Sequence, residues 1–196
     1  LFLSTNDPVD FINGLAGIDT VSYFSATSAV NASLSIVGAQ NTGGSGIDVL
    51  TSIENITGSA FNDTLQGNAL NNVINGGFGS DFVSYSNAAG SVTINLTSNT
   101  VTGAAGADTL FSIENAIGSN FADTIIGRFD NNIILAGDGN DVINASLGSD
   151  VIDGGLGTDS VIYSALTGPI TLGAFGVVTK SPGCLLYTSD AADEGL

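Results

Sequence analysis

The sequence predicts an all-β fold, a β-solenoid built from Gly/Asp-rich nonapeptide repeats. Aspartates recur at nine-residue steps, as in Asp141, Asp150 and Asp159. A glycine or another small residue stands five positions before most of these aspartates, and an aliphatic residue stands two positions after them. Each nonapeptide is therefore expected to form a six-residue turn and a three-residue strand whose central side chain points inward.

The same period continues along most of the chain. Asp123 and Asn132 extend the first run backwards, and Asp63, Asn72 and Asp81 form a second run. Because two nonapeptides close one coil, residues 18 apart should stack at about 4.8 Å, the usual spacing between strands. The inward aliphatic ladder is expected to comprise Ile12, Val21, Leu65, Ile74, Val83, Ile125, Ile134, Ile143, Ile152 and Val161.

Stacking at this period gathers the turn carboxylates into columns. The expected columns are Asp123, Asp141 and Asp159, with Asn132 and Asp150 opposite, and a shorter pair of Asp63 and Asp81. Stacked carboxylates repel, and the chain has 19 acidic residues but only two basic ones. Calcium binds six to eight carboxylate or carbonyl oxygens, whereas magnesium needs a tighter octahedron and softer metals prefer Cys or His. The columns therefore predict calcium.

Composition argues against several other functions. A formal net charge of −17 disfavours nucleic acid and anionic membrane surfaces as partners. With no His and one Cys, the usual zinc ligands and a His-dependent nucleophile are excluded. No apolar run is long enough for a membrane-spanning helix and no signal peptide is evident, so membrane insertion is not expected. With no Met, the sequence is expected to be part of a longer protein.

A larger repeat contains the nonapeptides. TVSYFSA at 20–26 returns as FVSYSNA at 82–88 and as SVIYSAL at 160–166. DVLTSIEN at 48–55 returns as DTLFSIEN at 108–115. Each large repeat is therefore expected to combine nonapeptides with an IEN-containing spacer.

These repeats divide the chain. We assign residues 1–75 to a first large repeat, 76–153 to a second with extra nonapeptides, and 154–183 to the start of a third. The string CLLYTSDAADE at 184–194 resembles a translated sequencing adapter. We therefore interpret residues 184–196 as a tail that is not native to the protein.

The turns carry a family resemblance. GGFGSD at 76–81, AGDGND at 136–141, GGLGTD at 154–159 and GGSGID at 43–48 are similar to the RTX, or haemolysin-type, calcium-binding repeats. The resemblance covers most of residues 10–165 and implies a parallel β-roll with calcium between turns on successive coils. It also implies Gram-negative type I secretion, and the spacers resemble those of large RTX adhesins.

The resemblance assigns the ligands to turn carboxylates and glycine carbonyls. The strongest site is expected between turns 136–141 and 154–159, with others at Asp63 with Asp81 and at Asp123 with Asp141. Two turns, GSAFND at 58–63 and GSNFAD at 118–123, replace turn glycines, and Asn72 and Asn132 replace the aspartate. Sites touching any of these turns should be weaker or empty. The candidate metal residues are Asp63, Gly76, Gly77, Gly79, Asp81, Asp123, Gly137, Gly139, Asp141, Asp150, Gly154, Gly155, Gly157 and Asp159.

Other acidic and aromatic residues receive plainer interpretations. Asp138 and Asp153 are expected to be solvated. Glu54 and Glu114 could be metal ligands or edge charges that deter strand addition, and the second interpretation is favoured. No stacking partner can be named for Asp48 or Asp108. The tyrosines that recur at one repeat position are expected to pack inside the solenoid. They are Tyr23, Tyr85 and Tyr163.

Three functions are compatible with this pattern. The first is a calcium-folded structural module of a large secreted or cell-surface protein, adhesin-like, which reaches a surface or polysaccharide target through other parts. The second is the calcium-binding module of a secreted RTX protease, lipase or epimerase. The third is a catalytic solenoid like the β-helix polysaccharide lyases, which is disfavoured because Arg128 and Lys180 are the only basic residues. No catalytic residue is expected in this chain.

Overall fold

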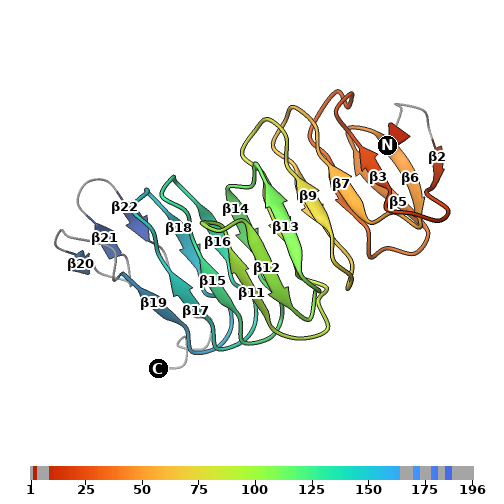
Figure 1. Cartoon of the computed structure of the whole chain (residues 1–196). Helices are drawn as coiled ribbons and strands as arrows, with labels where there is room; N and C mark the ends of the chain where they lie inside the picture. The colour runs from red at the N-terminus through yellow and green to blue at the C-terminus, as the bar shows by residue number, and fades with distance from the viewer. Residues whose placement is uncertain (1, 4–8, 164–169, 173–177, 181–183, 187–196) are drawn as a thin grey trace. The chain divides into compact units, whose positions relative to one another are not determined.

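The computed structural model describes residues 2–3, 9–163, 170–172, 178–180 and 184–186, with side chains in 9–163. Every regular element in these residues is a strand, and the part described holds no helix long and apolar enough to cross a membrane. The chain divides into two compact units, and Figure 1 shows the strands of both. Unit 1 is Leu1–Tyr85 with Ala105–Ile113, and unit 2 is Ser86–Ala104 with Glu114–Leu196.

Unit 1 contains two parallel sheets and a hairpin-bearing sheet. Strands β1, β3, β7, β9 and β13 pair in that order, as do β4, β8 and β10, while β6 lies between β2 and β5. The strands are β1 Phe2–Leu3, β2 Val9–Asn13, β3 Thr20–Ser22, β4 Asn31–Ser33, β5 Ala39–Gly43, β6 Gly46–Thr51, β7 Asn55–Thr57, β8 Thr64–Gln66, β9 Val73–Asn75, β10 Phe82–Ser84 and β13 Asp108–Phe111.

Unit 2 repeats the plan. Strands β11, β15, β17 and β19 are parallel neighbours, β12 is antiparallel to β11, and β14, β16 and β18 form a second parallel set. The strands are β11 Val92–Asn95, β12 Thr100–Gly103, β14 Asn115–Ile117, β15 Thr124–Ile126, β16 Ile133–Leu135, β17 Val142–Asn144, β18 Val151–Asp153, β19 Ser160–Ile162, β20 Ile170–Leu172, β21 Val178–Lys180 and β22 Cys184–Leu186. The remaining tail, 187–196, lies outside the described residues.

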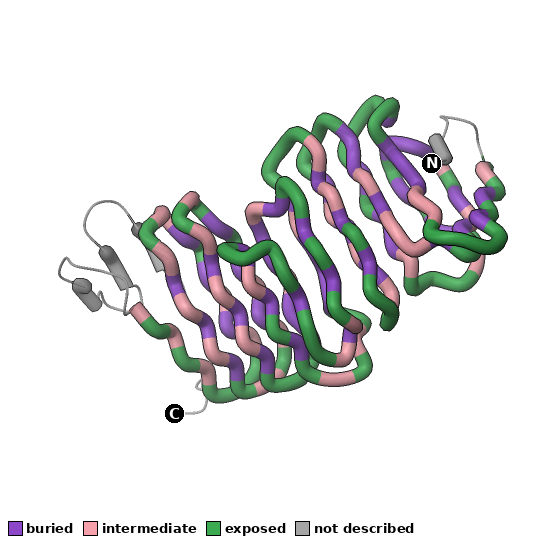
Figure 2. The backbone as a smooth tube through the Cα atoms, in the orientation of Figure 1, coloured by how far each residue is buried: buried purple, intermediate pink, exposed green. Residues whose placement is uncertain are grey.

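The predicted aliphatic ladder forms the core of each unit. In unit 2, Ile125 pairs in register with Ile143, and Ile134 pairs with Ile152, so partners are 18 residues apart as predicted. Each of these side chains is fully buried, whereas its strand neighbours are half-buried or exposed (Figure 2). Burying such a side chain stabilises the fold by roughly 1.5–3 kcal/mol. The parallel all-β solenoid predicted from the sequence is confirmed. Only Val161, in the last described coil, is half-buried.

The spacers differ from the expected pattern because they contain hairpins. Strands β5 and β6 are antiparallel, with Gly43 opposite Gly46, so Gly44 and Ser45 form a tight turn. Gly43 and Gly46, which flank the two central turn residues, both have positive φ, a conformation that glycine adopts readily. The interpretation of 43–48 as a nonapeptide turn is therefore wrong, since the GGSG sequence reverses the chain instead of continuing the coil.

Candidate metal centre

The turns that precede the parallel strands stack in register. In unit 2, the Asp123 backbone N–H donates to Asp141 Oδ1 at 2.7 Å, and the Asp141 N–H donates to Asp159 Oδ1 at 2.9 Å. In unit 1, the Asp63 N–H donates to Asp81 Oδ1 at 2.7 Å. Each carboxylate thus touches the turn before it. We call these two stacks the Asp columns of their units, and both were predicted.

Each unit has a second stack, which we call its Asn column. In unit 2 it comprises Glu114, Asn132 and Asp150, and the Asn132 N–H donates to Asp150 Oδ1 at 3.1 Å. The unit 1 Asn column comprises Asp19, Glu54, Asn72 and Asp108. As in the Asp columns, side chains in these stacks contact the backbone of a neighbouring turn: Asp108 and Asp150 accept a backbone N–H, whereas Asn72 and Asn132 donate to a backbone carbonyl.

Glycines let the turns of the Asp column in unit 2 approach closely. Gly155 and Gly157 have φ values of 81° and 136°, which disfavour other residues. A Cβ on Gly155 would overlap the carbonyl of Gly137, and one on Gly157 would overlap the carbonyl of Gly139. The carbonyl oxygens of one turn therefore lie directly against the backbone of the next.

The other candidate glycines have related roles. In unit 1, a Cβ on Gly77 or Gly79 would meet the carbonyl of Ser59 or Phe61. A Cβ on Gly154 would instead collide with the Asp159 carboxylate, and one on Gly76 would collide with both the Asp81 carboxylate and the Ser112 carbonyl. These two first-position glycines make room for the carboxylate, a role that differs from exposing a carbonyl.

The first aspartate of each Asp column accepts hydrogen bonds from its own turn and from one residue of an earlier segment, Val30 for Asp63 and Val92 for Asp123. Asp63 Oδ1 accepts the Ser59 hydroxyl at 2.7 Å, and Asp63 Oδ2 accepts the Ser59 N–H at 2.5 Å. Asp123 makes the same pair of contacts with Ser119, at 2.8 and 2.5 Å. The serines replace the second turn glycine here, so a protein hydroxyl meets the carboxylate at these two turns.

Asp141 is different, because one of its oxygens is buried and accepts no hydrogen bond from the residues that the structure describes. Its side chain is 1% exposed, and Oδ2 finds no donor among the described residues. Burial raises the pKa of the Asp141 carboxyl to about 6, although the Asp123 N–H opposes this, and the charges of Asp123, Asp159 and Asp138 add to it. A buried acceptor without a donor is costly unless a cation meets it.

The donor set at this turn fits a hard cation. Among residues 9–163, no three acidic, histidine or cysteine side chains come together as a metal-binding group. A cation beside Asp141 would therefore take much of its coordination from backbone carbonyls such as those of Gly137 and Gly139. Oxygen ligands from carboxylates and carbonyls are those that calcium accepts.

The Asn columns contain two glutamates whose role the sequence pattern did not reveal. Glu54 stands 18 residues before Asn72, and Glu114 stands 18 before Asn132, so both fall on the turn-aspartate position. Glu54 Oε2 accepts the Asp19 N–H at 2.8 Å. Glu54 also precedes β7, which lies between β3 and β9, so its interpretation as an edge charge is wrong. Counting back one coil from each Asn would have found both residues.

The aspartates that lacked predicted partners have protein partners. Asp108 Oδ1 accepts the Asn72 N–H and Oδ2 accepts the Tyr85 hydroxyl, both at 2.8 Å. Asp48 Oδ2 accepts the Thr42 hydroxyl at 2.9 Å. Burial raises the pKa of Asp108 to about 6, partly opposed by the Tyr85 and Asn72 hydrogen bonds. Tyr23 and Tyr85 are packed inside, as predicted, and Tyr85 also anchors a carboxylate.

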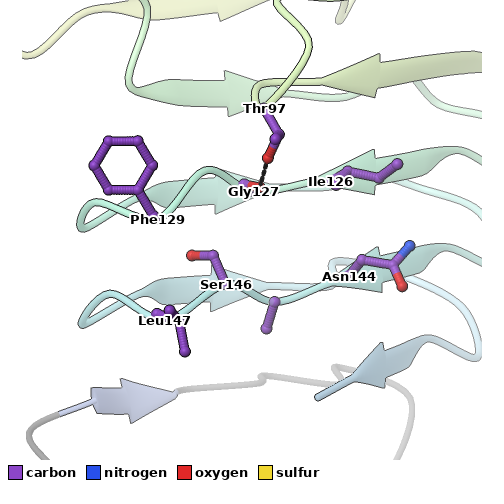
Figure 3. Close-up of a pocket in the computed structure, with 8 residues that line it drawn as sticks. Thr97, Ile126, Gly127, Phe129, Asn144, Ser146 and Leu147 are labelled. Atoms are coloured by element: carbon purple, nitrogen blue, oxygen red, sulfur yellow. Dashed lines mark hydrogen bonds between the residues drawn. The ribbon is translucent and has the colours of Figure 1, made fainter. Parts of the chain in front are cut away.

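Unit 2 also has a surface pocket of about 470 Å³ (Figure 3). The Thr97 hydroxyl donates to the Gly127 carbonyl at its rim. Among the described residues, none of those that line the pocket is acidic or basic. Its lining consists of Thr97, Ile126, Gly127, Phe129, Asn144, Ala145, Ser146 and Leu147.

Stacked glycine turns, buried carboxylates and an inward aliphatic ladder define a parallel β-roll of the metal-binding solenoid class. A family model, the RTX calcium-binding nonapeptide repeat, matches the chain in four copies, at 53–86, 95–112, 117–152 and 126–161. The chain therefore belongs to the RTX calcium-binding repeat proteins, as the sequence predicts. No curated protein matches it.

Proposed function

We propose that this chain is a calcium-binding β-roll module that completes its folding when calcium binds, and that its principal site lies between turns 136–141 and 154–159. The observation that carries the proposal is the buried Oδ2 of Asp141, which has no donor among the described residues. Calcium at this position would neutralise the repulsion among neighbouring carboxylates. Asp141 and Asp159 supply carboxylate oxygens, and the carbonyls of Gly137, Gly139, Gly155 and Gly157 supply the rest.

Secondary sites lie along the same columns. In unit 1, the turns ending at Asp63 and Asp81 form the candidate pair, with the carbonyls of Gly77 and Gly79. In unit 2, Asp123 with Asp141 forms another. Asp63 and Asp123 already accept serine hydroxyls, so these sites should be weaker than the principal one.

The mechanism is folding linked to metal binding. The core of each described coil is a narrow ladder, and its buried carboxylates oppose compaction in the absence of a cation. A ligand that binds only the folded state stabilises it by about 2.7 kcal/mol at 100 times its Kd. Extracellular calcium modules typically bind at about 10⁻⁴–10⁻³ M. We infer a secreted or cell-surface parent of the large RTX adhesin kind, in which the module becomes ordered after export.

The test compares the full chain with the double variant Asp141→Asn/Asp159→Asn. We expect the double variant to lose most of the calcium-dependent rise in melting temperature and most of the calcium heat measured by titration calorimetry. The control is Asp138→Asn, because Asp138 is an exposed acid in the same turn. Equal losses in the control and the double variant, or a wild-type chain whose circular dichroism and melting are unmoved by millimolar calcium, would refute the proposal.

A further inference from the structure

One contact recurs at the same place in both Asn columns. Asn72 Nδ2 donates to the carbonyl of Glu54 at 2.7 Å, and Asn132 Nδ2 donates to the carbonyl of Glu114, also at 2.7 Å. Both asparagines are almost fully buried, at 2% and 1% exposure. In each case the amide joins its own turn to the carbonyl of the turn 18 residues earlier. Two independent occurrences make this contact a property of the repeat.

The partners of each amide fix its orientation. Asn72 Oδ1 accepts the backbone N–H of Asn68, and Asn132 Oδ1 accepts that of Arg128, each at 2.8 Å. The amide oxygen therefore faces a donor, and the amide nitrogen faces a carbonyl oxygen. An aspartate at this position would satisfy the first partner equally well. It would place its second oxygen against a carbonyl, and two acceptors repel unless a cation lies between them.

The Asp column shows the consequence of an aspartate at this turn position. Asp141 occupies the same position in its turn as Asn132 does, and its Oδ2 has no donor among the described residues. Asp141 Oδ1 accepts the Asp123 N–H of the preceding turn, so only one of its two oxygens has a protein partner in the described part of the chain. Asn132 has a protein partner for both amide atoms, because Oδ1 accepts the Arg128 N–H and Nδ2 donates to the Glu114 carbonyl. The asparagine therefore leaves no side-chain atom for calcium, whereas the aspartate leaves one oxygen that we assign to it.

The rest of the Asn column also has protein partners. Asp150 Oδ1 accepts the Asn132 N–H, and its Oδ2 accepts the Ser146 hydroxyl at 3.0 Å. Glu114 pairs with the guanidinium of Arg128 at 3.3 Å. The negative charge of this column thus meets hydrogen-bond donors and a cation that belong to the protein.

We propose that Asn72 and Asn132 replace calcium, so that metal binds along the Asp columns and the Asn columns stay closed without it. This inference rests on the proposed calcium-binding function and extends it to which turns take the ion. It corrects one candidate ligand, because Asp150 then belongs to a metal-free column. It also makes the metal requirement of a turn depend on a single side-chain atom.

The proposal predicts a gain of calcium binding in Asn132→Asp. In EDTA, the variant should melt about 5 °C or more below wild type, because a buried acceptor loses its partner. Saturating calcium should restore most of the difference, and calorimetry should detect an additional calcium ion per chain. Asn72→Asp tests the same prediction in unit 1 and should behave alike.

Asn131→Asp is the matched control. Asn131 is exposed, and its Oδ1 accepts the Ser149 N–H at 2.7 Å. An aspartate at this position can accept the same hydrogen bond, so Asn131→Asp adds the same charge without placing an oxygen against a carbonyl. If Asn132→Asp melts like this control in EDTA and binds no more calcium than wild type, the replacement proposal is wrong while the calcium function stands. If wild type itself binds no calcium, the proposed function fails first. A variant that remains unfolded even in saturating calcium would also count against the proposal.

Discussion

The two columns of unit 2 share a backbone contact between successive turns but handle charge in opposite ways. In both, a turn residue accepts the backbone N–H of the residue 18 positions earlier. The Asp column has glycine at the second position of its last two turns, Gly137 and Gly155, whereas the Asn column has Arg128 and Ser146. At the second turn position, a residue with a side-chain donor lets protein groups satisfy the turn. A glycine at that position offers no side-chain donor, so a carboxylate oxygen is left for a cation.

The largest expected effect is at the second turn position. Gly155→Ala should destabilise the calcium-loaded chain by about 3 kcal/mol or more, because φ is 81° and the new Cβ would overlap the Gly137 carbonyl. Ser146→Ala, at the same position in the Asn column, should cost about 1 kcal/mol through its lost bond to Asp150. Chemical denaturation in millimolar calcium measures both, and equal effects would contradict the distinction between the columns.

The next effect concerns pH in the absence of metal. The pKa of Asp108 is about 6 in the folded protein, above its ordinary value of 3.8. The folded state therefore holds the proton more tightly than the unfolded state does. The contribution of this group to stability is fully present below about pH 4 and is lost as the pH rises through about 6.

Asp108→Asn isolates this contribution. An amide can accept the Asn72 N–H and meet the Tyr85 hydroxyl without titrating, so the variant should lose the fall in melting temperature between pH 4 and 6 in EDTA that Asp108 causes. An unchanged pH profile would show that Asp108 is not the group responsible.

The principal calcium site should respond to pH in the opposite direction. Calcium needs an ionised Asp141, so the apparent calcium affinity of the site should fall below about pH 6.

The period of the sequence predicts the stacking, and the structure confirms it. A spacing of nine residues places Ile125 beside Ile143 and Asp123 beside Asp141, because strands keep a fixed spacing and alternation. The stacking of these residues follows from strand spacing and side-chain alternation, which recur from coil to coil. The Asp columns could therefore be predicted by counting residues.

The exceptions depended on contacts between distant residues. GGSG reads as a nonapeptide turn, but Gly43 and Gly46 close a hairpin because β5 finds an antiparallel partner in β6. The Tyr85–Asp108 bond joins residues 23 apart, which is no multiple of the repeat. Glu54 was missed for a different reason, since its longer side chain conceals an aspartate position that the 18-residue count would have shown.

The smallest expected effect concerns the guanidinium of Arg128, the cationic side chain in the Asn column of unit 2. Arg128 pairs with Glu114 at 3.3 Å and Asp130 at 2.9 Å, and its side chain is 24% exposed. Arg128→Gln should lower stability by less than about 1 kcal/mol at low ionic strength, and the difference should disappear in about 1 M salt, because partly exposed ion pairs are weak and screened. Melting with and without salt measures this. A larger, salt-independent loss would mean that the Asn column needs a fixed cation as the Asp column does, and that the amides of Asn72 and Asn132 alone do not close it.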